Sequence, residues 1–272
     1  AIYLLTKKQL GGFLTGIKNW DKTTLSLIGL FFLSGIISLF IGGINSAKIG
    51  QFLVWFIQPI SLFFIMKFTF AQNPNAKTYL LLTIYYLLAF SGLYAIVQYF
   101  TLLGLPPAWL GNSVEPKRAL SFFSHPNFYA LWGAPLLAML IPDLASRIKD
   151  KGLKISYAYL WAWIIGTLGL LFSFSRAGWL GLAAAVFIYL IVVADNKIRL
   201  TALSGIMVLV IVAFATPNLR YRLLLPFYGE KSTVSRLSLW HTGIKAVKEA
   251  PIFGLGLRGF SKNWQRLNTD PG

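Results

Sequence analysis

Three short stretches of this chain hold the residues whose types and spacing suit chemistry, and each is built around arginine. They are residues 118–127, 172–181 and 235–260, which read RALSFFSHPN, FSFSRAGWLG and SRLSLWHTGIKAVKEAPIFGLGLRGF. A guanidinium group presents planar, paired donors that match the oxygens of a phosphate better than a lysine ammonium does. The pattern therefore favours binding of a phosphate-like anion.

The first stretch places polar residues at the start of an expected helix. His125, Pro126 and Asn127 follow Arg118, and proline suits the first helical position because no N–H donor is needed there. From the residues alone, a helix start with interfacial polar groups is the favoured interpretation, ahead of a binding role.

The second stretch places Arg176 where two apolar runs meet with almost no loop between them. Two interpretations of this arginine stay open with equal weight. It snorkels to the membrane surface, or it faces the helix bundle, where desolvation makes an anion its natural partner.

The third stretch carries an amphipathic helix at about residues 233–250, with Arg236 near its start and Pro251 after its end. A glycine-punctuated turn follows and ends at Arg258. We expect the apolar face of the helix to pack on spans or to lie in the membrane interface. The residues of this face recur in steps of three, four and three, as one helical stripe requires: Leu237, Trp240, Ile244 and Val247.

The elements that must position these residues are membrane spans. The chain is 56% hydrophobic and 12% charged, about half the charge fraction of a soluble domain, and its mean hydropathy is +0.65. Several apolar runs approach the roughly 20 residues that cross a bilayer as a helix, so we expect an all-α, polytopic membrane bundle. About seven spans are expected: residues 23–43, 49–66 with a kink at Pro59, 79–103, 126–141, two within 155–194, and 200–216.

The same pattern predicts two regions. Residues 1–216 form the transmembrane bundle, with residues 1–5 as the tail of an earlier span and a charged turn at 142–154. Residues 217–272 form an outer segment that carries the amphipathic helix, and a further span is expected to follow it.

The orientation follows from lysine and arginine in alternate short loops, since the cytoplasmic loops carry the excess. Twelve such residues fall in one set, and four fall in the other, namely Lys48, Lys117, Arg118 and Arg176. The second set and the C-terminal segment are therefore predicted to lie outside. This segment has a net charge of +6, for which two explanations remain: long outer segments escape the rule, or the segment binds something strongly anionic.

Composition also excludes several classes of chemistry. The absence of cysteine excludes thiol catalysis and disulfides, while two histidines and eight scattered acidic residues argue against a metal centre. We therefore predict no metal and no cofactor. The net charge of +17 is interpreted as membrane anchoring and affinity for anionic lipid or phosphate, rather than for nucleic acid.

The three stretches together resemble the O-antigen ligase and polymerase superfamily of bacterial membrane glycan transferases. The shared motifs are an arginine before a His/Asn-Pro-Asn helix start, a Ser-Arg-Gly/Ala junction, and an arginine helix that ends in Pro-x-x-Gly-x-Gly; they cover residues 118–260. The resemblance implies metal-independent, inverting transfer of a glycan from an undecaprenyl-diphosphate carrier to an acceptor hydroxyl, such as one of lipid A-core. It implies an inner-membrane enzyme whose active face is toward the periplasm.

Residue roles also come from this resemblance. It implies that Arg176 and Arg236 bind the diphosphate, with Arg258 and Arg118 as further candidates. His125, Asn127 and Trp240 are expected to support the site.

The resemblance places the catalytic histidine downstream of the Gly-x-Gly pair, beyond Gly272, so we expect these 272 residues to bind donor without turnover. His241 is a weaker candidate for the base. The sequence departs from the family pattern at Ser121, where the family usually has glycine shortly after the first arginine.

Alternatives from other classes remain at this stage. One is a polymerase of the same superfamily, another an anion or bicarbonate transporter with a basic vestibule, and a third a scaffold subunit without chemistry. Transporters usually carry ionisable groups or paired broken helices at mid-membrane. The expected spans show neither pattern, which favours the enzyme.

Overall fold

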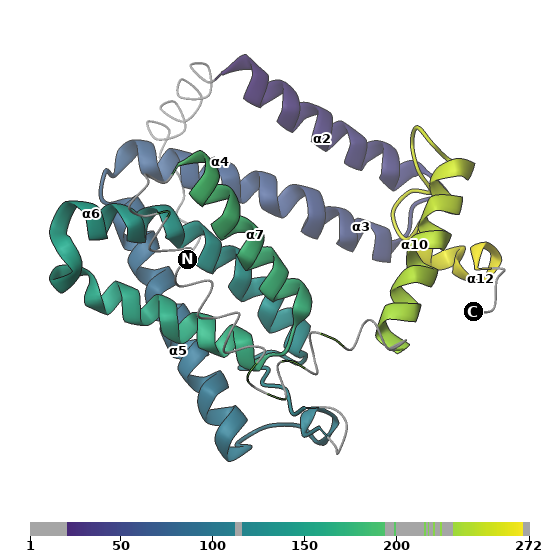
Figure 1. The fold of residues 1–272 in the computed structure, drawn as a ribbon. Coiled ribbons are helices and arrows are strands. Elements are labelled where there is room, and N and C mark those ends of the chain that lie inside the picture. Colours follow the sequence, from purple (N-terminus) through teal and green to yellow (C-terminus); the bar gives the residue numbers. More distant parts are fainter. Residues whose placement is uncertain are drawn as a thin grey trace. The chain divides into compact units, whose positions relative to one another are not determined.

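The computed structural model of the protein (Figure 1) describes residues 21–111, 116–193 and 231–268, and the single positions Arg199, Ala215, Pro217, Arg220 and Leu224. Every regular element in these residues is helical, which confirms the all-α class. The predicted tail at residues 1–5 and the predicted span 200–216 lie outside the described residues.

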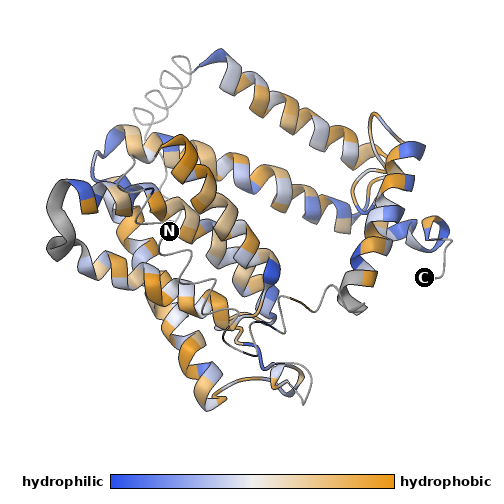
Figure 2. Ribbon diagram, viewed as in Figure 1, coloured by the Kyte–Doolittle hydropathy of each residue, from blue (hydrophilic) through white to orange (hydrophobic). Residues whose placement is uncertain are grey.

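Within the described residues, four helical stretches are long and apolar enough to cross a membrane, and Figure 2 shows apolar residues along them. Two shorter apolar helices, Tyr157–Phe172 and Arg176–Val192, correspond to the two spans expected within residues 155–194. The number of seven spans stays a prediction. The four long candidates are Lys22–Phe40, Ser46–Gln72, Ala76–Thr101 and Pro126–Lys149.

The chain divides into two compact units, one of residues 1–76 with 229–272 and the other of residues 77–228. In the first unit, α2 (Lys22–Phe40) is followed by α3 (Ser46–Phe52), a π-helical segment η1 (Leu53–Ile57) and α4 (Gln58–Gln72). Its C-terminal part holds α10 (Lys231–Glu249), α11 (Gly259–Lys262) and α12 (Trp264–Leu267).

The predicted kink at Pro59 takes the form of the π-helical segment. Pro59 lies in the first turn of α4, immediately after η1. Proline has no N–H to donate and its ring clashes with the carbonyl one turn earlier, so a locally widened turn accommodates it within a continuous span.

The second unit contains α5 (Ala76–Thr101), a short 3-10 turn η2 (Pro107–Trp109), α6 (Pro126–Phe172) and α7 (Arg176–Val192). Helix α6 is helical from Pro126 to Phe172, yet it doubles back on itself (Figure 1). Its halves pack together, since the Trp163 indole Nε1 donates to the Leu137 carbonyl at 3.0 Å. The reversal expected at residues 142–154 is therefore present, although the backbone there is helical rather than a loop.

Glycines let the helices of this unit approach closely. A Cβ at Gly92 on α5 would collide with the Ile165 carbonyl on the second half of α6. A Cβ at Gly178 on α7 would lie 2.8 Å from the Ala130 Cβ on the first half of α6. These close contacts hold α5, α6 and α7 together and so position the junction at which α6 ends and α7 begins.

Candidate functional site

Arg118 joins three segments at one end of the second unit. Its Nε donates to the Ser173 carbonyl at 3.0 Å, and its Nη2 donates to Asn127 Oδ1 at 2.8 Å. Its guanidinium carbon lies 5.4 Å from the centre of the Trp109 ring, within the range of a cation–π contact. Both ends of α6 are thereby held next to each other by one side chain.

The segment after Arg118 is fastened to α5 by a buried glutamine. Gln98 is fully buried, and its Oε1 accepts from the backbone N–H groups of Leu120 and Ser121 at 2.8 and 3.0 Å. Its Nε2 donates to the Gly104 carbonyl at 3.3 Å. Sequence reasoning missed Gln98, although an amide near the end of an apolar span is a signal for a buried polar role.

Ser121 occupies the position at which the sequence departs from the glycine of the resembled family. Its φ is +52°, in the left-handed region that glycine adopts without strain. Its Oγ donates to the Ser91 carbonyl at 2.9 Å, a hydrogen bond that glycine lacks. Ser121 therefore combines a left-handed backbone with a hydroxyl that anchors this segment to α5.

His125 caps the N-terminus of α6. Its Nδ1 accepts from the backbone N–H of Asn127 at 3.0 Å, and Pro126 occupies the first helical turn as predicted. The ring contacts Trp109 edge to face at 4.5 Å. Burial, followed by the nearby Arg118 charge, lowers the pKa of His125, which favours the neutral ring that the cap requires.

Arg176 is the first residue of α7 and only 9% exposed. The three residues before it connect α6 to α7 through Ser173, the residue whose carbonyl Arg118 contacts, and through Phe174, which has a φ of +49°. Arg176 is therefore buried within its unit rather than extended into solvent. Such a fixed, desolvated guanidinium at a helix N-terminus is suited to an anion.

Helix α10 carries Arg236, and its predicted extent of about 233–250 agrees with the observed Lys231–Glu249. The face that packs within its unit is the small-residue face with Thr242 and Ala246, which are buried. The predicted apolar stripe is exposed within this unit, with Trp240 at 72%. The stripe therefore does not pack on the spans of its own unit, and the membrane-interface interpretation remains as a prediction.

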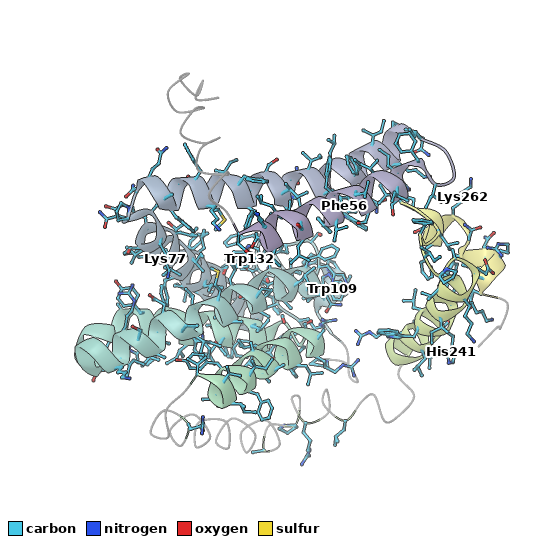
Figure 3. The ribbon with its side chains drawn as sticks, turned by 90° about the horizontal axis from the view of Figure 1, so that it is seen from above. Phe56, Lys77, Trp109, Trp132, His241 and Lys262 are labelled. Carbon is cyan, nitrogen blue, oxygen red and sulfur yellow. The ribbon has the colours of Figure 1, made fainter. Side chains whose placement is uncertain are left out.

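His241 also lies on α10 and is exposed (Figure 3). Gly243 follows Arg236 by about two turns on nearly the same side of α10, and it has open space above its backbone. The arginine face of α10 is thus accessible within its unit, with room for another group.

Arg258 ends the glycine turn in a left-handed conformation, with a φ of +60°. Gly254 and Gly256 also have positive φ, and the Leu257 N–H donates to the Ser38 carbonyl at 2.9 Å. The turn is therefore docked on the C-terminal end of α2. Its arginine is exposed at the start of α11.

The structure thus gathers four predicted site residues in the second unit, namely Arg118, His125, Asn127 and Arg176, around the two ends of α6. The first unit carries Arg236 and Trp240 on α10 and Arg258 in the glycine turn. Among the described residues, no three His, Asp or Glu side chains are grouped in a way that would hold a metal ion.

Comparison with known proteins gives one finding. Residues 161–271 match the family model described as O-antigen ligase. Searches of curated proteins and of solved structures found no match. The matched region contains the α6–α7 junction, α10 and the glycine turn, and it supports the O-antigen ligase superfamily and glycan transfer by a ligase- or polymerase-like membrane enzyme.

Proposed function

We propose, starting from the family match over residues 161–271, that this protein transfers a glycan from an undecaprenyl-diphosphate carrier to an acceptor hydroxyl. The acceptor is lipid A-core or another hydroxyl-bearing glycan, and the reaction takes place at the periplasmic face of the bacterial inner membrane. The observation that carries this proposal is Arg176, a buried guanidinium held at the start of α7 inside the matched region.

The reaction requires strong stabilisation of the leaving group. The acceptor oxygen attacks the anomeric carbon, the bond from that carbon to the diphosphate oxygen breaks, and the bonding electrons leave with the diphosphate. The configuration at the anomeric carbon is inverted. Fixed guanidinium groups aimed at the diphosphate stabilise this growing charge more than that of the ground state, which is how they accelerate the step.

Four arginines share this role in the proposal. Arg176 and Arg236 hold the diphosphate, and Arg118 and Arg258 provide further positive charge. Asn127 and His125 keep Arg118 and the start of α6 in place, through the hydrogen bonds described above. Trp240 supports Arg236 from the same side of α10.

The proton of the acceptor hydroxyl passes to a general base. His125 does not suit this role, because its Nδ1 is occupied by the helix cap. The resemblance places the base downstream of the Gly-x-Gly pair, and His241, exposed on α10, is the weaker candidate.

The test uses the full-length protein in liposomes with undecaprenyl-diphosphate-linked glycan and candidate acceptors. Arg176→Ala and Arg236→Ala are compared with wild type, and His241→Ala tests the weaker base candidate. We expect wild type to transfer glycan and both arginine variants to lose most of the activity. A single product band on a gel identifies a ligase and a ladder identifies a polymerase, whereas anion flux without transfer would reject the proposal in favour of a transporter.

A further inference from the structure

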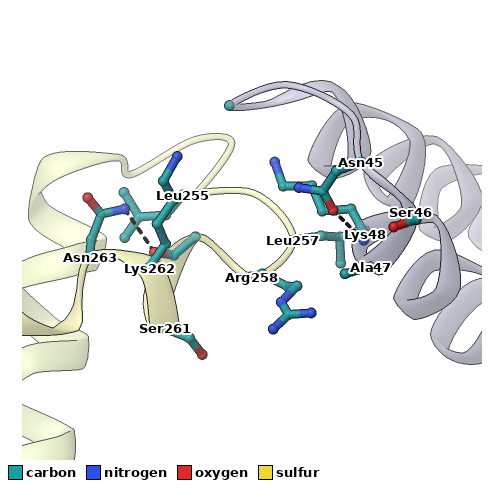
Figure 4. A pocket seen from close by; sticks show the side chains of 12 residues that line it. Asn45, Ser46, Ala47, Lys48, Leu255, Leu257, Arg258, Ser261, Lys262 and Asn263 are labelled. Atoms are coloured by element: carbon teal, nitrogen blue, oxygen red, sulfur yellow. Dashed lines mark hydrogen bonds between the residues drawn. The ribbon is translucent and has the colours of Figure 1, made fainter.

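A pocket in the first unit brings together cations that the proposed reaction does not fully use. It has a volume of about 650 Å³ (Figure 4). One wall is formed by residues 42–48, which cover the α2–α3 connection and the start of α3, and the other by residues 255–263, which cover the end of the glycine turn and α11. Three of its lining residues are cationic, namely Lys48, Arg258 and Lys262. Its twelve lining residues, all in the described part of the chain, include no aspartate or glutamate.

The walls of this pocket are held rigidly against each other. The Leu257 N–H donates to the Ser38 carbonyl at 2.9 Å. Gly256 packs so tightly on the end of α2 that a Cβ there would lie 2.8 Å from the Ile41 Cβ. The pocket is therefore formed by two docked segments, and both of them contribute cationic residues to its lining.

Lys48 is the buried cation of the pocket, at 6% exposure. Its Nζ donates to the carbonyls of Ile41 and Gly43 at 2.6 and 2.8 Å, and its backbone N–H is capped by Asn45 Oδ1 at 2.9 Å. Both Nζ acceptors are neutral carbonyls, so these bonds hold the ammonium in place without cancelling its charge. A buried ammonium raises the local positive potential, because little water is present to screen it.

The other two cations approach from the opposite wall. Arg258 has a left-handed backbone at the start of α11, and Lys262 follows one turn later. Neutral polar groups lie among them, including the hydroxyls of Ser46 and Ser261. The lining therefore offers several donors around concentrated positive charge, which a phosphate or diphosphate with many acceptor oxygens satisfies better than a single carboxylate does.

We propose that this pocket binds a phosphate or diphosphate group, with Lys48, Arg258 and Lys262 as its cationic contacts. The inference deepens the proposed function and rests on it through Arg258, which belongs to both sets. It adds Lys48 and Lys262 as substrate-binding residues on the outer loops. The group comes from the carrier, from a phosphorylated glycan or from a lipid headgroup, and these share the same chemistry.

The test measures protection of lysines from acylation and does not depend on transfer. The full-length protein in phosphatidylcholine nanodiscs is treated with an acetylating reagent, and the modification of each lysine is followed by mass spectrometry. Inorganic pyrophosphate is added in one arm, sodium chloride of equal ionic strength in a second, and phosphatidylglycerol replaces part of the lipid in a third. Lys248, exposed on α10 outside the pocket, is the internal control.

We expect pyrophosphate to slow acylation of Lys262 about threefold or more while Lys248 changes little, since an exposed cation gains a modest contact from an ion. Protection by phosphatidylglycerol to which pyrophosphate adds nothing further would identify a lipid headgroup as a source and would still support the site. Equal protection of Lys262 and Lys248, or equal protection by sodium chloride, would overturn the proposal.

Two variants separate binding from folding. Arg258→Gln removes one exposed cation of the pocket and should weaken pyrophosphate protection of Lys262, whereas Lys248→Ala should leave that protection unchanged. Lys48→Met keeps the apolar stem but loses the charge and its two carbonyl contacts. Because Lys48→Met can disturb the loop, the result for Arg258→Gln decides. Loss of glycan transfer with intact protection would count against the proposed reaction and not against this pocket.

Discussion

At the scale of single residues, the end of the second unit is organised by Arg118, His125 and Asn127. His125 accepts the Asn127 N–H, and Asn127 in turn accepts from Arg118, so one chain of hydrogen bonds runs from the helix cap to the arginine. The neutral ring of His125 is required for this chain. A protonated Nδ1 becomes a donor and can no longer accept the N–H.

The lowered pKa of His125 makes the stability of this cap dependent on pH. Because the folded protein favours the neutral ring, the stabilisation is fully present above the ordinary pKa of 6.5 and is lost as the pH falls below it. We expect the melting temperature of the wild-type protein to fall between pH 7.5 and pH 5.5. His125→Asn keeps a capping side chain but cannot titrate in this range, so it should remove the part of this fall that His125 causes.

Scanning fluorimetry across that pH range measures this effect, with His241→Asn as the control. An equally steep pH dependence in His125→Asn would show that other groups cause it.

Ser121 gives a second prediction at this scale. Ser121→Ala keeps the left-handed backbone but loses the bond to Ser91, so it should destabilise the protein by about 1 kcal/mol. Ser121→Gly loses the same bond but relieves the backbone strain, so its stability should lie closer to wild type. Thermal denaturation of the two variants compares them directly. A glycine variant that is less stable than the alanine variant would contradict the account.

Sequence reasoning succeeded for some of these residues and not for others. His125 and Pro126 were predicted as a helix start because a cap depends on neighbours in the chain. The role of Gln98 depends on Leu120 and Ser121, more than twenty residues away, and no local pattern indicates such a contact. For Arg176, two interpretations stayed open, since burial is decided by how α6 and α7 pack.

At the scale of elements, the glycine turn before α11 places strict demands on which residues it can contain. Gly254 and Gly256 have similar positive φ values, of +67° and +73°, but different surroundings. A Cβ at Gly254 meets nothing within 4 Å, whereas one at Gly256 meets Ile41 and the Ser38 carbonyl. The two positions therefore form a matched pair in which backbone strain is shared and docking differs.

We predict that Gly254→Ala costs about 1–2 kcal/mol from the left-handed backbone alone. Gly256→Ala should cost about 2–5 kcal/mol, because overpacking against α2 adds to that strain. Hydrogen exchange at residues 255–263 in the membrane-embedded protein reports the loosened turn. Equal effects of the two substitutions would mean that the turn does not dock on α2.

Helix α10 shows the limit of periodicity as a guide. Its length followed from the spacing of apolar residues and from Pro251, and both agree with the structure. The packed face did not follow, because the small residues Thr242 and Ala246 contribute little to an apolar pattern. A hydrophobic stripe indicates which side avoids water, but not whether protein or lipid covers it.

At the scale of the whole molecule, the structure describes two helical units that each carry part of the arginine set. Within each unit, segments that the lysine and arginine count places on the same side of the membrane contact each other. Arg118 contacts the segment before Arg176 in the second unit, and Lys48 shares a pocket with Arg258 in the first. Composition was enough to predict the all-α class, whereas the contacts inside each unit depend on long-range packing, and the sidedness stays a prediction.

The central claim is that Arg176 and Arg236 bind the diphosphate of a lipid-linked donor. The most direct measurement is the equilibrium affinity of the full-length protein in nanodiscs for undecaprenyl diphosphate, with undecaprenyl monophosphate for comparison. We predict that Arg236→Ala and Arg176→Ala each weaken diphosphate binding by about tenfold or more, the loss expected for one charge-assisted hydrogen bond.

Arg266→Ala is the matched control, since it removes an exposed arginine that pairs with Glu249 on the surface. It should leave the affinity unchanged. Because Arg236 is exposed, its substitution tests binding without disturbing the core, while Arg176 is buried. Wild-type affinity in both Arg236→Ala and a folded Arg176→Ala protein would contradict the claim, and selective loss of diphosphate binding in both would establish it.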